Sequence, residues 1–257
     1  MPLKRLFAYL TLSAIALWTA GCAGPAKPAE ITVAAASDLK VPLTKIAADF
    51  ERATGATINL SFGSSGLISR QIENGAPIDI FMSASKKFID PLAKKKLVGQ
   101  SKPYARAFVV LIGKARTHSE LLLPTIKKIA IANPKHAPFG AAAVEILKND
   151  KTWPQVKDKL VYADNVSQAY EFVKTGNADA GFVALSLAKP ANIEYTIMNP
   201  RLYEPLTLWV APIAKTKRPK TTRAFIEFLS APESLKTLES NGIQPLSKSG
   251  TGKRGAK

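Results

Sequence analysis

Cysteine and histidine are scarce in this chain of 257 residues, which has one cysteine, Cys22, and two histidines, His118 and His136. A single cysteine cannot form a disulfide within the chain. One cysteine and two separated histidines also provide no ligand cluster for a protein-bound transition metal. The sequence lacks the G-x-x-x-x-G-K-[ST] motif as well, which argues against a nucleotide-binding P-loop.

Acidic residues are also few: 19 Asp and Glu stand against 36 Lys and Arg, which gives a formal net charge of +17. The lysines are scattered and aromatic residues are not interleaved with them, so the composition disfavours nucleic acid as a partner. A general positive field that gathers small anions, or a surface held near anionic lipid, fits this charge balance better.

The N-terminus carries the only long apolar run, LFAYLTLSAIALW, which follows Lys4 and Arg5. This run is shorter than the roughly 20 residues of a bilayer-spanning helix, so residues 1–22 are predicted to be a secretory signal. The letters TAGC place small residues before Cys22 and resemble a bacterial lipobox, although Thr19 stands where such boxes usually have Leu. Cys22 is therefore a candidate for lipid attachment, and the alternative is cleavage nearby that leaves a free thiol.

Two further segments flank the predicted folded body. Residues 23–29 form a short linker rich in Pro and Ala, and residues 247–257, SKSGTGKRGAK, form a basic tail without apolar periodicity that is predicted to be disordered. Removing residues 1 to 21 takes away Lys4 and Arg5 and no acidic residue, so the formal charge falls from +17 to +15. The sequence thus predicts a basic, exported protein located in the periplasm.

From residue 31 onward, short β-branched runs alternate with helical patterns. The nine runs predict strands, in the order ITVAAA, ATINLSF, IDIFMSA, AFVVLIG, KIAIAN, KLVYAD, AGFVAL, NIEYTIM and LTLWVAPI. This alternation predicts an α/β fold with mixed sheets covered by helices on both faces. We expect two lobes, residues 30–107 with 208–246 and residues 108–207, joined by crossing strands near residues 108–112 and 206–213.

Four of the predicted strands end in similar turns that begin a helix. The turns contain Ser37 and Asp38, Ser64 and Ser65, Phe139, and Val166. Backbone N–H groups in the first turn of a helix lack internal partners, and the helix dipole makes that end partly positive. Such ends bind anions, and ligands of open α/β sheets gather beyond the carboxyl ends of strands. The four turns are therefore predicted to converge on one anion site, although a serine at a helix start is more often only a cap.

The segments AAASDL, SFGSSGLISRQIENGAPIDIFMSAS, NPKHAPFGAAA and NVSQAYEFVKTGNADAGFVALS resemble the periplasmic molybdate-binding proteins of bacterial ABC importers. The resemblance covers nearly all of residues 30–245. It implies a two-lobed type II periplasmic-binding fold, a monomer that binds molybdate or tungstate without a cofactor, and delivery of the ion to an ABC permease in the inner membrane.

The same resemblance implies roles for individual residues. Ser37 and Ser65 would donate from hydroxyl and backbone, Phe139 and Val166 from backbone N–H, and Asp38 from its amide, with Ser64 as a neighbour. Some members of the family supply a tyrosine hydroxyl where this chain has Ala184. That departure leaves the number of donors open.

The choice of oxyanion depends on protons and on size. A site made only of donors suits an ion without protons, such as molybdate, tungstate or sulfate, whereas hydrogen phosphate needs an acceptor. Asp38 and Asp164 are the two nearby acceptors, so phosphate stays an alternative; we expect both carboxylates to cap helix starts instead. The sequence does not give the cavity size that separates sulfate from molybdate.

Other functions are less well supported. An acyl-transfer enzyme is disfavoured because Leu67 occupies the final glycine position of a G-x-S-x-G elbow, and both histidines are expected at the surface. Iron(III) carriers share this architecture and use tyrosine ligands, for which the candidates here are Tyr162, Tyr170 and Tyr203. Core packing is the expected role of Tyr170. A basic adhesive lipoprotein is the remaining alternative.

Overall fold

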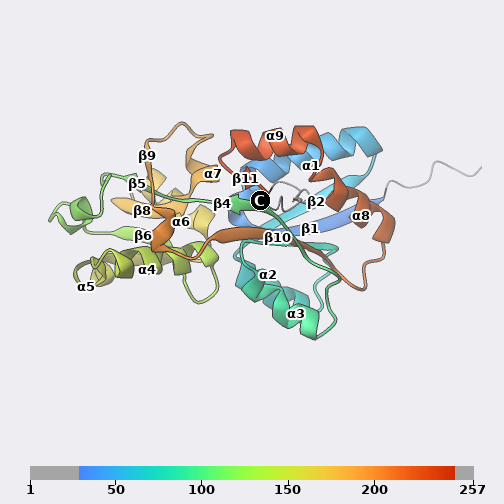
Figure 1. The fold of residues 1–257 in the computed structure, drawn as a ribbon, viewed down its shortest axis with the longest axis horizontal. Coiled ribbons are helices and arrows are strands. Elements are labelled where there is room, and N and C mark those ends of the chain that lie inside the picture. Colours follow the sequence, from blue (N-terminus) through green and yellow to red (C-terminus); the bar gives the residue numbers. More distant parts are fainter. Residues whose placement is uncertain (1–28, 247–257) are drawn as a thin grey trace, which may run out of the picture.

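The computed structural model describes residues 29–246, which form two β-sheets with helices packed around them (Figure 1). The predicted signal, the candidate lipidation at Cys22, nearly all of the predicted linker and the basic tail lie outside the described residues. Within residues 29–246, no helix combines the length and the apolar character needed to cross a membrane.

The first sheet has six strands in the order β11-β4-β10-β3-β1-β2. Strand β1 pairs in parallel with β2 and β3, whereas β10 runs antiparallel between β3 and β4. The strands span β1 Glu30–Ala36, β2 Thr57–Gly63, β3 Ile80–Ser83, β4 Lys102–Ala107, β10 Leu206–Pro212 and β11 Gln244–Pro245.

The second sheet has five strands in the order β7-β6-β8-β5-β9. Strand β6 pairs in parallel with β7 and β8, and β5 pairs antiparallel with β8 and β9. The strands span β5 Val109–Gly113, β6 Ile129–Ala132, β7 Leu160–Ala163, β8 Ala180–Ala184 and β9 Tyr195–Ile197. Both sheets are mixed, as the sequence predicted.

Helices connect the strands and cover the sheets (Figure 1). In the first sheet, α1, α8 and α9 lie on one side and α2 and α3 on the other, while α4 and α6 pack against β6 and β8 of the second sheet. The α-helices span α1 Lys40–Thr54, α2 Ser65–Glu73, α3 Asp90–Lys94, α4 Pro138–Asn149, α5 Trp153–Val156, α6 Val166–Lys174, α7 Leu185–Ala188, α8 Pro219–Phe228 and α9 Pro232–Ser240.

Helix α1 shows how the sequence pattern determines an element. Leu43, Ile46 and Phe50 recur at helical spacing and are buried against the first sheet. The helix ends at Gly55, whose φ of 69° lies in the left-handed region that glycine enters without a steric penalty. The Phe50 ring meets Phe225 of α8 edge to face at 5.2 Å, which fixes α8 on the same side of the sheet.

The chain passes between the two sheets at two places. Strand β4 ends at Ala107 and β5 begins at Val109, so Phe108 makes the first passage. The second passage is the short segment 203–205 that precedes β10. The sequence placed the crossings within residues 108–112 and 206–213, whereas β5 lies wholly in the second sheet and β10 wholly in the first. We propose that each sheet and its helices form one lobe, with the first boundary at Phe108 as predicted and the second just before β10, two residues earlier than predicted.

Candidate functional site

Strand register brings the predicted turns together. Ala36 at the end of β1 lies beside Gly63 at the end of β2, so Ser37 and Ser64 follow at the same edge of the first sheet. In the second sheet Ala132 at the end of β6 lies beside Ala163 at the end of β7. The turns that follow these four strand ends meet where the two sheets face each other.

All six predicted site residues line one small cavity at this meeting point: Ser37, Asp38, Ser64, Ser65, Phe139 and Val166. All six are buried. The cavity measures about 10 Å³, close to the minimum that admits one water molecule. Its remaining lining residues are small or apolar, and none is Lys or Arg: Ala36, Gly63, Ala84, Ala137 and Pro138.

Two serine hydroxyls at the cavity retain a proton to donate. The Ser65 Oγ accepts a hydrogen bond from the Ala84 backbone N–H at 3.1 Å. The Ser37 Oγ accepts one from the Ser167 N–H at 3.3 Å. Because a hydroxyl carries one donor and two acceptor positions, each serine can still donate its O–H to an anion.

Two helix starts add backbone donors. Helix α4 begins at Pro138, so the first N–H of the helix is that of Phe139, and α6 begins at Val166. Within residues 29–246, neither the Phe139 N–H nor the Val166 N–H takes part in a hydrogen bond. Such N–H groups at the positive ends of helices of 12 and 9 residues suit an anion.

The two sheets are also joined directly beside the cavity by His136. Its ring Nδ1 lies 2.8 Å from the Ser64 Oγ, and its carbonyl accepts a hydrogen bond from the Gly66 N–H at 2.9 Å. The expectation that His136 has only a surface role is therefore wrong. Burial lowers the pKa of His136, with the positive charge of Arg70 adding to that effect and Asp164 opposing it.

Two serines that the sequence did not single out complete the contact between the sheets. The Ser167 hydroxyl donates to the Ser37 carbonyl at 3.1 Å, and the Ser186 hydroxyl donates to the Asp38 carbonyl at 2.6 Å. Ser186 stands two residues after Ala184, which lies outside the cavity lining. Serines in turns are too common to mark these two without the fold, although Ser167 stands beside the predicted Val166.

Among the described residues that line the cavity, Asp38 is the only one with an ionisable side chain, and that side chain is fully buried. Neither of its oxygens has a hydrogen-bond partner among the described residues. Burial raises the pKa of Asp38 from 3.8 to about 7, and its own backbone N–H opposes this in part. The expected capping by Asp38 is wrong, and at the fourth turn the Asn165 side chain, not that of Asp164, caps α6 by accepting from the Gln168 N–H.

The candidate tyrosines of the iron alternative and His118 lie elsewhere, whereas Asp38, the acceptor that a phosphate site would use, lines the cavity. None of the three candidate tyrosines lines the cavity: Tyr162 is exposed, Tyr170 is buried, and the Tyr203 hydroxyl accepts a hydrogen bond from the Val109 N–H at 3.2 Å. His118, expected in a solvated loop, instead pairs with Asp150 and is only 23% exposed. Within residues 29–246, His, Cys, Asp and Glu form no group of three that could hold a metal ion.

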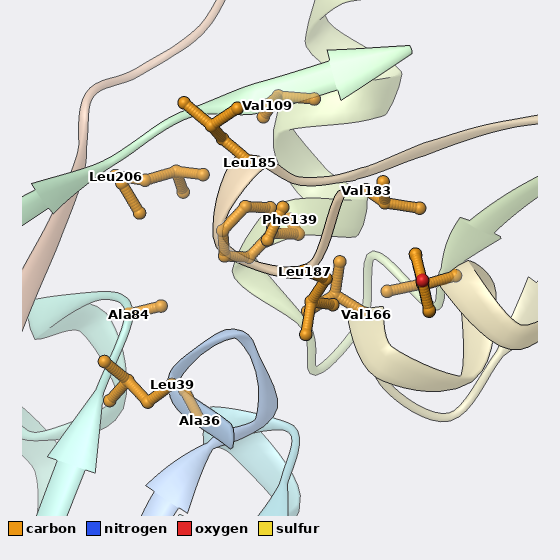
Figure 2. Close-up of a cluster of buried hydrophobic side chains, with 14 of the residues drawn as sticks. Ala36, Leu39, Ala84, Val109, Phe139, Val166, Val183, Leu185, Leu187 and Leu206 are labelled. Carbon is orange, nitrogen blue, oxygen red and sulfur yellow. The ribbon is translucent and has the colours of Figure 1, made fainter. Parts of the chain in front are cut away.

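Apolar side chains from both sheets surround the cavity. Figure 2 shows the Phe139 ring with Ala84 of the first sheet's turns to one side and Val166 of the second to the other, and all three residues line the cavity. These side chains exclude water, and hydrogen bonds to an anion are stronger in such surroundings than in solvent. The site is thus a buried pocket formed by both halves of the molecule, in which neutral donors surround the cavity and Asp38 is the one ionisable residue among the described lining.

Comparisons with known proteins agree with this architecture. A family model described as bacterial extracellular solute-binding protein matches residues 31–244. The molybdate-binding protein ModA of Azotobacter vinelandii is 33% identical over 239 residues, which cover 89% of this chain and 95% of the relative. The corresponding protein of Rhodobacter capsulatus is 34% identical over 236 residues, covering 86% and 91% of the two chains.

A solved structure gives the same picture. The periplasmic molybdate-binding protein of Azotobacter vinelandii superimposes with a TM-score of 0.78 at 26% identity, covering 83% of this chain and 98% of that one. Its fold supports the assignment of two mixed sheets as a periplasmic-binding architecture. Because the family model spans nearly all of the described residues and the relatives align over most of their length, this chain belongs to the bacterial extracellular solute-binding proteins.

Proposed function

We propose that this protein captures molybdate, and also tungstate, in the cavity between its two sheets and delivers the ion to an ABC permease. The observation that carries the proposal is the convergence of Ser37, Ser65, Phe139 and Val166 on one cavity without a cationic side chain. Relatives named for molybdate binding, similar over most of this chain, support the choice of ion. No covalent chemistry occurs on the protein.

The proposed donors divide by type. Ser37 and Ser65 donate from hydroxyl and backbone, while Phe139 and Val166 donate from backbone N–H. The Asp38 amide lies in the first turn and is a further donor. The Ser64 hydroxyl is bonded to His136, so Ser64 contributes from its backbone or by holding the lobes together. No protein atom reaches the metal, because the oxygens of the ion accept all the hydrogen bonds.

Neutral donors suit a doubly charged ion that must later be released. Preorganised N–H and O–H groups spread the charge of the ion through charge-assisted hydrogen bonds. Release then separates no buried ion pair. A cavity of about 10 Å³ admits the ion only after the lobes move apart, so binding includes a hinge motion at Phe108 and at residues 203–205.

The location and assembly of the protein are part of the same proposal. We infer export to the periplasm as a monomer, with a lipid anchor at Cys22. These features would keep the protein close to the permease that receives the ion. Mass spectrometry of the membrane fraction tests the anchor, since a diacylglyceryl group at Cys22 adds a defined mass to the N-terminal peptide.

A calorimetric series with molybdate, tungstate, sulfate and phosphate tests the function. We expect molybdate and tungstate to bind tightly, and sulfate and phosphate to bind weakly or not at all. Heating gives an independent readout: molybdate at about 100 times its Kd should raise the free energy of unfolding by roughly 2.7 kcal/mol. A heat of binding with phosphate or sulfate but not with molybdate would show that one of those ions is the ligand instead. No binding of any of the four ions would contradict the proposal.

A further inference from the structure

A carboxyl group at Asp38 is unexpected in a site proposed to bind a doubly negative ion. Asp38 lines the cavity that would hold a dianion, and its carboxyl is fully buried and has no hydrogen-bond partner within residues 29–246. Asp38 belongs to the 3₁₀ helix Ser37–Leu39, directly beside the Ser37 hydroxyl that would donate to the ion. An ionised Asp38 would thus add a second buried negative charge beside the bound dianion.

The surroundings of Asp38 provide no cation to offset its charge. The elements packed against the 3₁₀ helix are α1, β2, α6 and α7, and neither β2 nor α7 carries a titratable side chain. The charged residues of α1 and α6 are exposed or bonded elsewhere: Lys40, Lys45, Asp49, Glu51, Arg52, Glu171 and Lys174.

Two other titratable side chains belong to this environment, Tyr104 of β4 and Tyr170 of α6. The Tyr104 hydroxyl is buried without a partner among the described residues, and burial together with the Asp38 charge raises its pKa well above 10. Burial likewise raises the pKa of Tyr170. Both tyrosines are therefore neutral at physiological pH and cannot balance a carboxylate.

We propose that the Asp38 carboxyl takes up a proton when molybdate binds, so that capture of the ion and uptake of one proton are coupled. The inference rests on the function proposed above. Protonation removes the repulsion between carboxylate and dianion, and it costs less than holding two buried like charges together. The neutral carboxyl also offers an O–H donor in a site otherwise made of donors.

The direction of the pH dependence follows from burial. In the closed structure the pKa of Asp38 is already about 7, and a dianion beside it raises this pKa further. Between the pKa values of the free and bound states, binding takes up close to one proton per ion. Over that range the affinity for molybdate falls by up to about tenfold per pH unit. At pH values where the ion-free protein already carries this proton, binding takes up none and the coupling fades.

Calorimetry with sodium molybdate at pH 8 measures the protons directly. The same titration is run in Tris and in HEPES, whose ionisation enthalpies differ, so the difference in heat gives the number of protons taken up. Wild-type protein should take up more than half a proton per ion at pH 8. Asp38→Asn should bind with no proton uptake and with an affinity that stays constant between pH 6 and 8.5.

Two matched variants test whether another group carries the proton. His136 contacts Ser64 at the cavity, and Asp164 lines the larger cleft beside Ser37. His136→Gln and Asp164→Asn should both retain the proton uptake of the wild type at pH 8. Loss of uptake in either variant while molybdate still binds would assign the proton to that residue and overturn the inference.

The remaining outcomes are also decisive. Molybdate binding by the wild type without proton uptake overturns the inference and leaves the proposed function intact, whereas absence of binding overturns both. Uptake that persists in Asp38→Asn also overturns the inference. Circular dichroism shows whether Asp38→Asn folds. If it does not, the wild type and the two matched variants test the inference instead: proton uptake in all three supports Asp38, because neither His136 nor Asp164 then carries the proton.

Discussion

Ser65 occupies the first position of α2, where its buried hydroxyl accepts one hydrogen bond and still has a proton to donate. We predict that Ser65→Ala weakens molybdate binding by about 1.5 to 3 kcal/mol, or roughly 10- to 100-fold, because a hydrogen bond to a charged group is lost. Calorimetry at constant pH measures the change. Removing the hydroxyl also leaves the buried Ala84 N–H without its partner, so a modest loss of stability should accompany it.

Ser61→Ala is the matched control for this prediction. Ser61 lies on β2 of the same lobe, but its side chain is exposed and does not line the cavity. The control should bind molybdate as tightly as the wild type. Equal affinity in Ser65→Ala and the wild type would remove the Ser65 hydroxyl from the site.

Asp38 should also affect the stability of the unliganded protein. Its pKa is about 7 in the folded state, against an ordinary value of 3.8 that applies once the chain is unfolded, so the unfolded chain loses this proton more easily. The carboxyl therefore costs nothing below pH 3.8, and its cost grows up to about pH 7, where linkage puts it at roughly 4 kcal/mol. The buried amide of Asp38→Asn also lacks hydrogen-bond partners, which lowers the free energy of unfolding by on the order of 1 to 3 kcal/mol.

The expected result is an Asp38→Asn variant that is more stable than the wild type at pH 8, by about 1 to 3 kcal/mol, and less stable than it at pH 4, by up to about 2 kcal/mol, because at pH 4 the carboxyl costs little while the unpartnered amide still does. Urea denaturation at both pH values, without molybdate, measures the difference. Asp158→Asn, an exposed acid outside the cavity, should change little at either pH. A variant that is less stable than the wild type at pH 8 would show that Asp38 has a partner in solution.

At the scale of elements, the first turn of α2 meets the second lobe without room for a side chain. A Cβ on Gly66 would lie 2.8 Å from both the Cβ and the carbonyl oxygen of His136, and 2.8 Å from the edge of the Phe88 ring. The backbone of α2 itself accepts alanine, which favours helix by about 1 kcal/mol over glycine. Gly66→Ala should therefore oppose closure of the lobes more than it disturbs the fold.

We predict that Gly66→Ala weakens molybdate binding at least tenfold, while its free energy of unfolding without ligand changes by less than about 1 kcal/mol. Calorimetry and urea denaturation separate the two effects. A Cβ at Gly63, in the same turn, would meet only Ile68 of its own lobe at 3.4 Å, so Gly63→Ala should lose less affinity. Wild-type affinity in Gly66→Ala would mean that α2 and His136 do not meet in the liganded protein.

The elements also show what the sequence could and could not predict. All nine strands expected from short β-branched and apolar runs are present, because these residue types favour the extended, half-buried surface of a sheet. Strand β4, Lys102–Ala107, was missed because Pro103, Lys102 and Arg106 mask its pattern. The four turns could be predicted because a strand end followed by a helix start is visible in a short stretch of sequence. The contact between Ser64 and His136 could not, because it joins residues 72 apart in the chain.

At the scale of the whole molecule, two lobes meet around a cavity whose described lining contains no cation. Hydrogen bonds from Gly66, Ser167 and Ser186 join the lobes in addition to whatever the ion contributes. Because these hydrogen bonds already stabilise the closed form, the ion needs a smaller preference for the closed over the open form to keep the lobes shut. The positive charge of the protein lies on the surface instead, where it acts on approaching ions.

One group of surface cations lies at the start of α8 and the loop before it, where five basic side chains are exposed: Lys215, Lys217, Arg218, Lys220 and Arg223. Within residues 29–246, none of the five forms an ion pair or lines the cavity. They belong to the long-range field of a chain whose formal charge is +17. Such a field raises association rates with anions and is screened by salt.

We therefore predict that salt slows the capture of molybdate and leaves its release unchanged. Raising the ionic strength from about 20 to 300 mM should lower the association rate constant on the order of tenfold, because screening shortens the reach of the field. The dissociation rate constant should change less than about twofold, because no cation touches the ion in the proposed site. Stopped-flow tryptophan fluorescence measures both constants.

Replacing the five basic residues of 215–223 with Gln tests the origin of this effect. The variant should associate several-fold more slowly than the wild type at low salt and equally fast at high salt, since screening removes the difference. Its dissociation rate should match that of the wild type at both salt concentrations, because the cavity and its donors are unchanged. A faster dissociation in the variant would place these cations next to the bound ion, and a site made only of neutral donors would then be wrong.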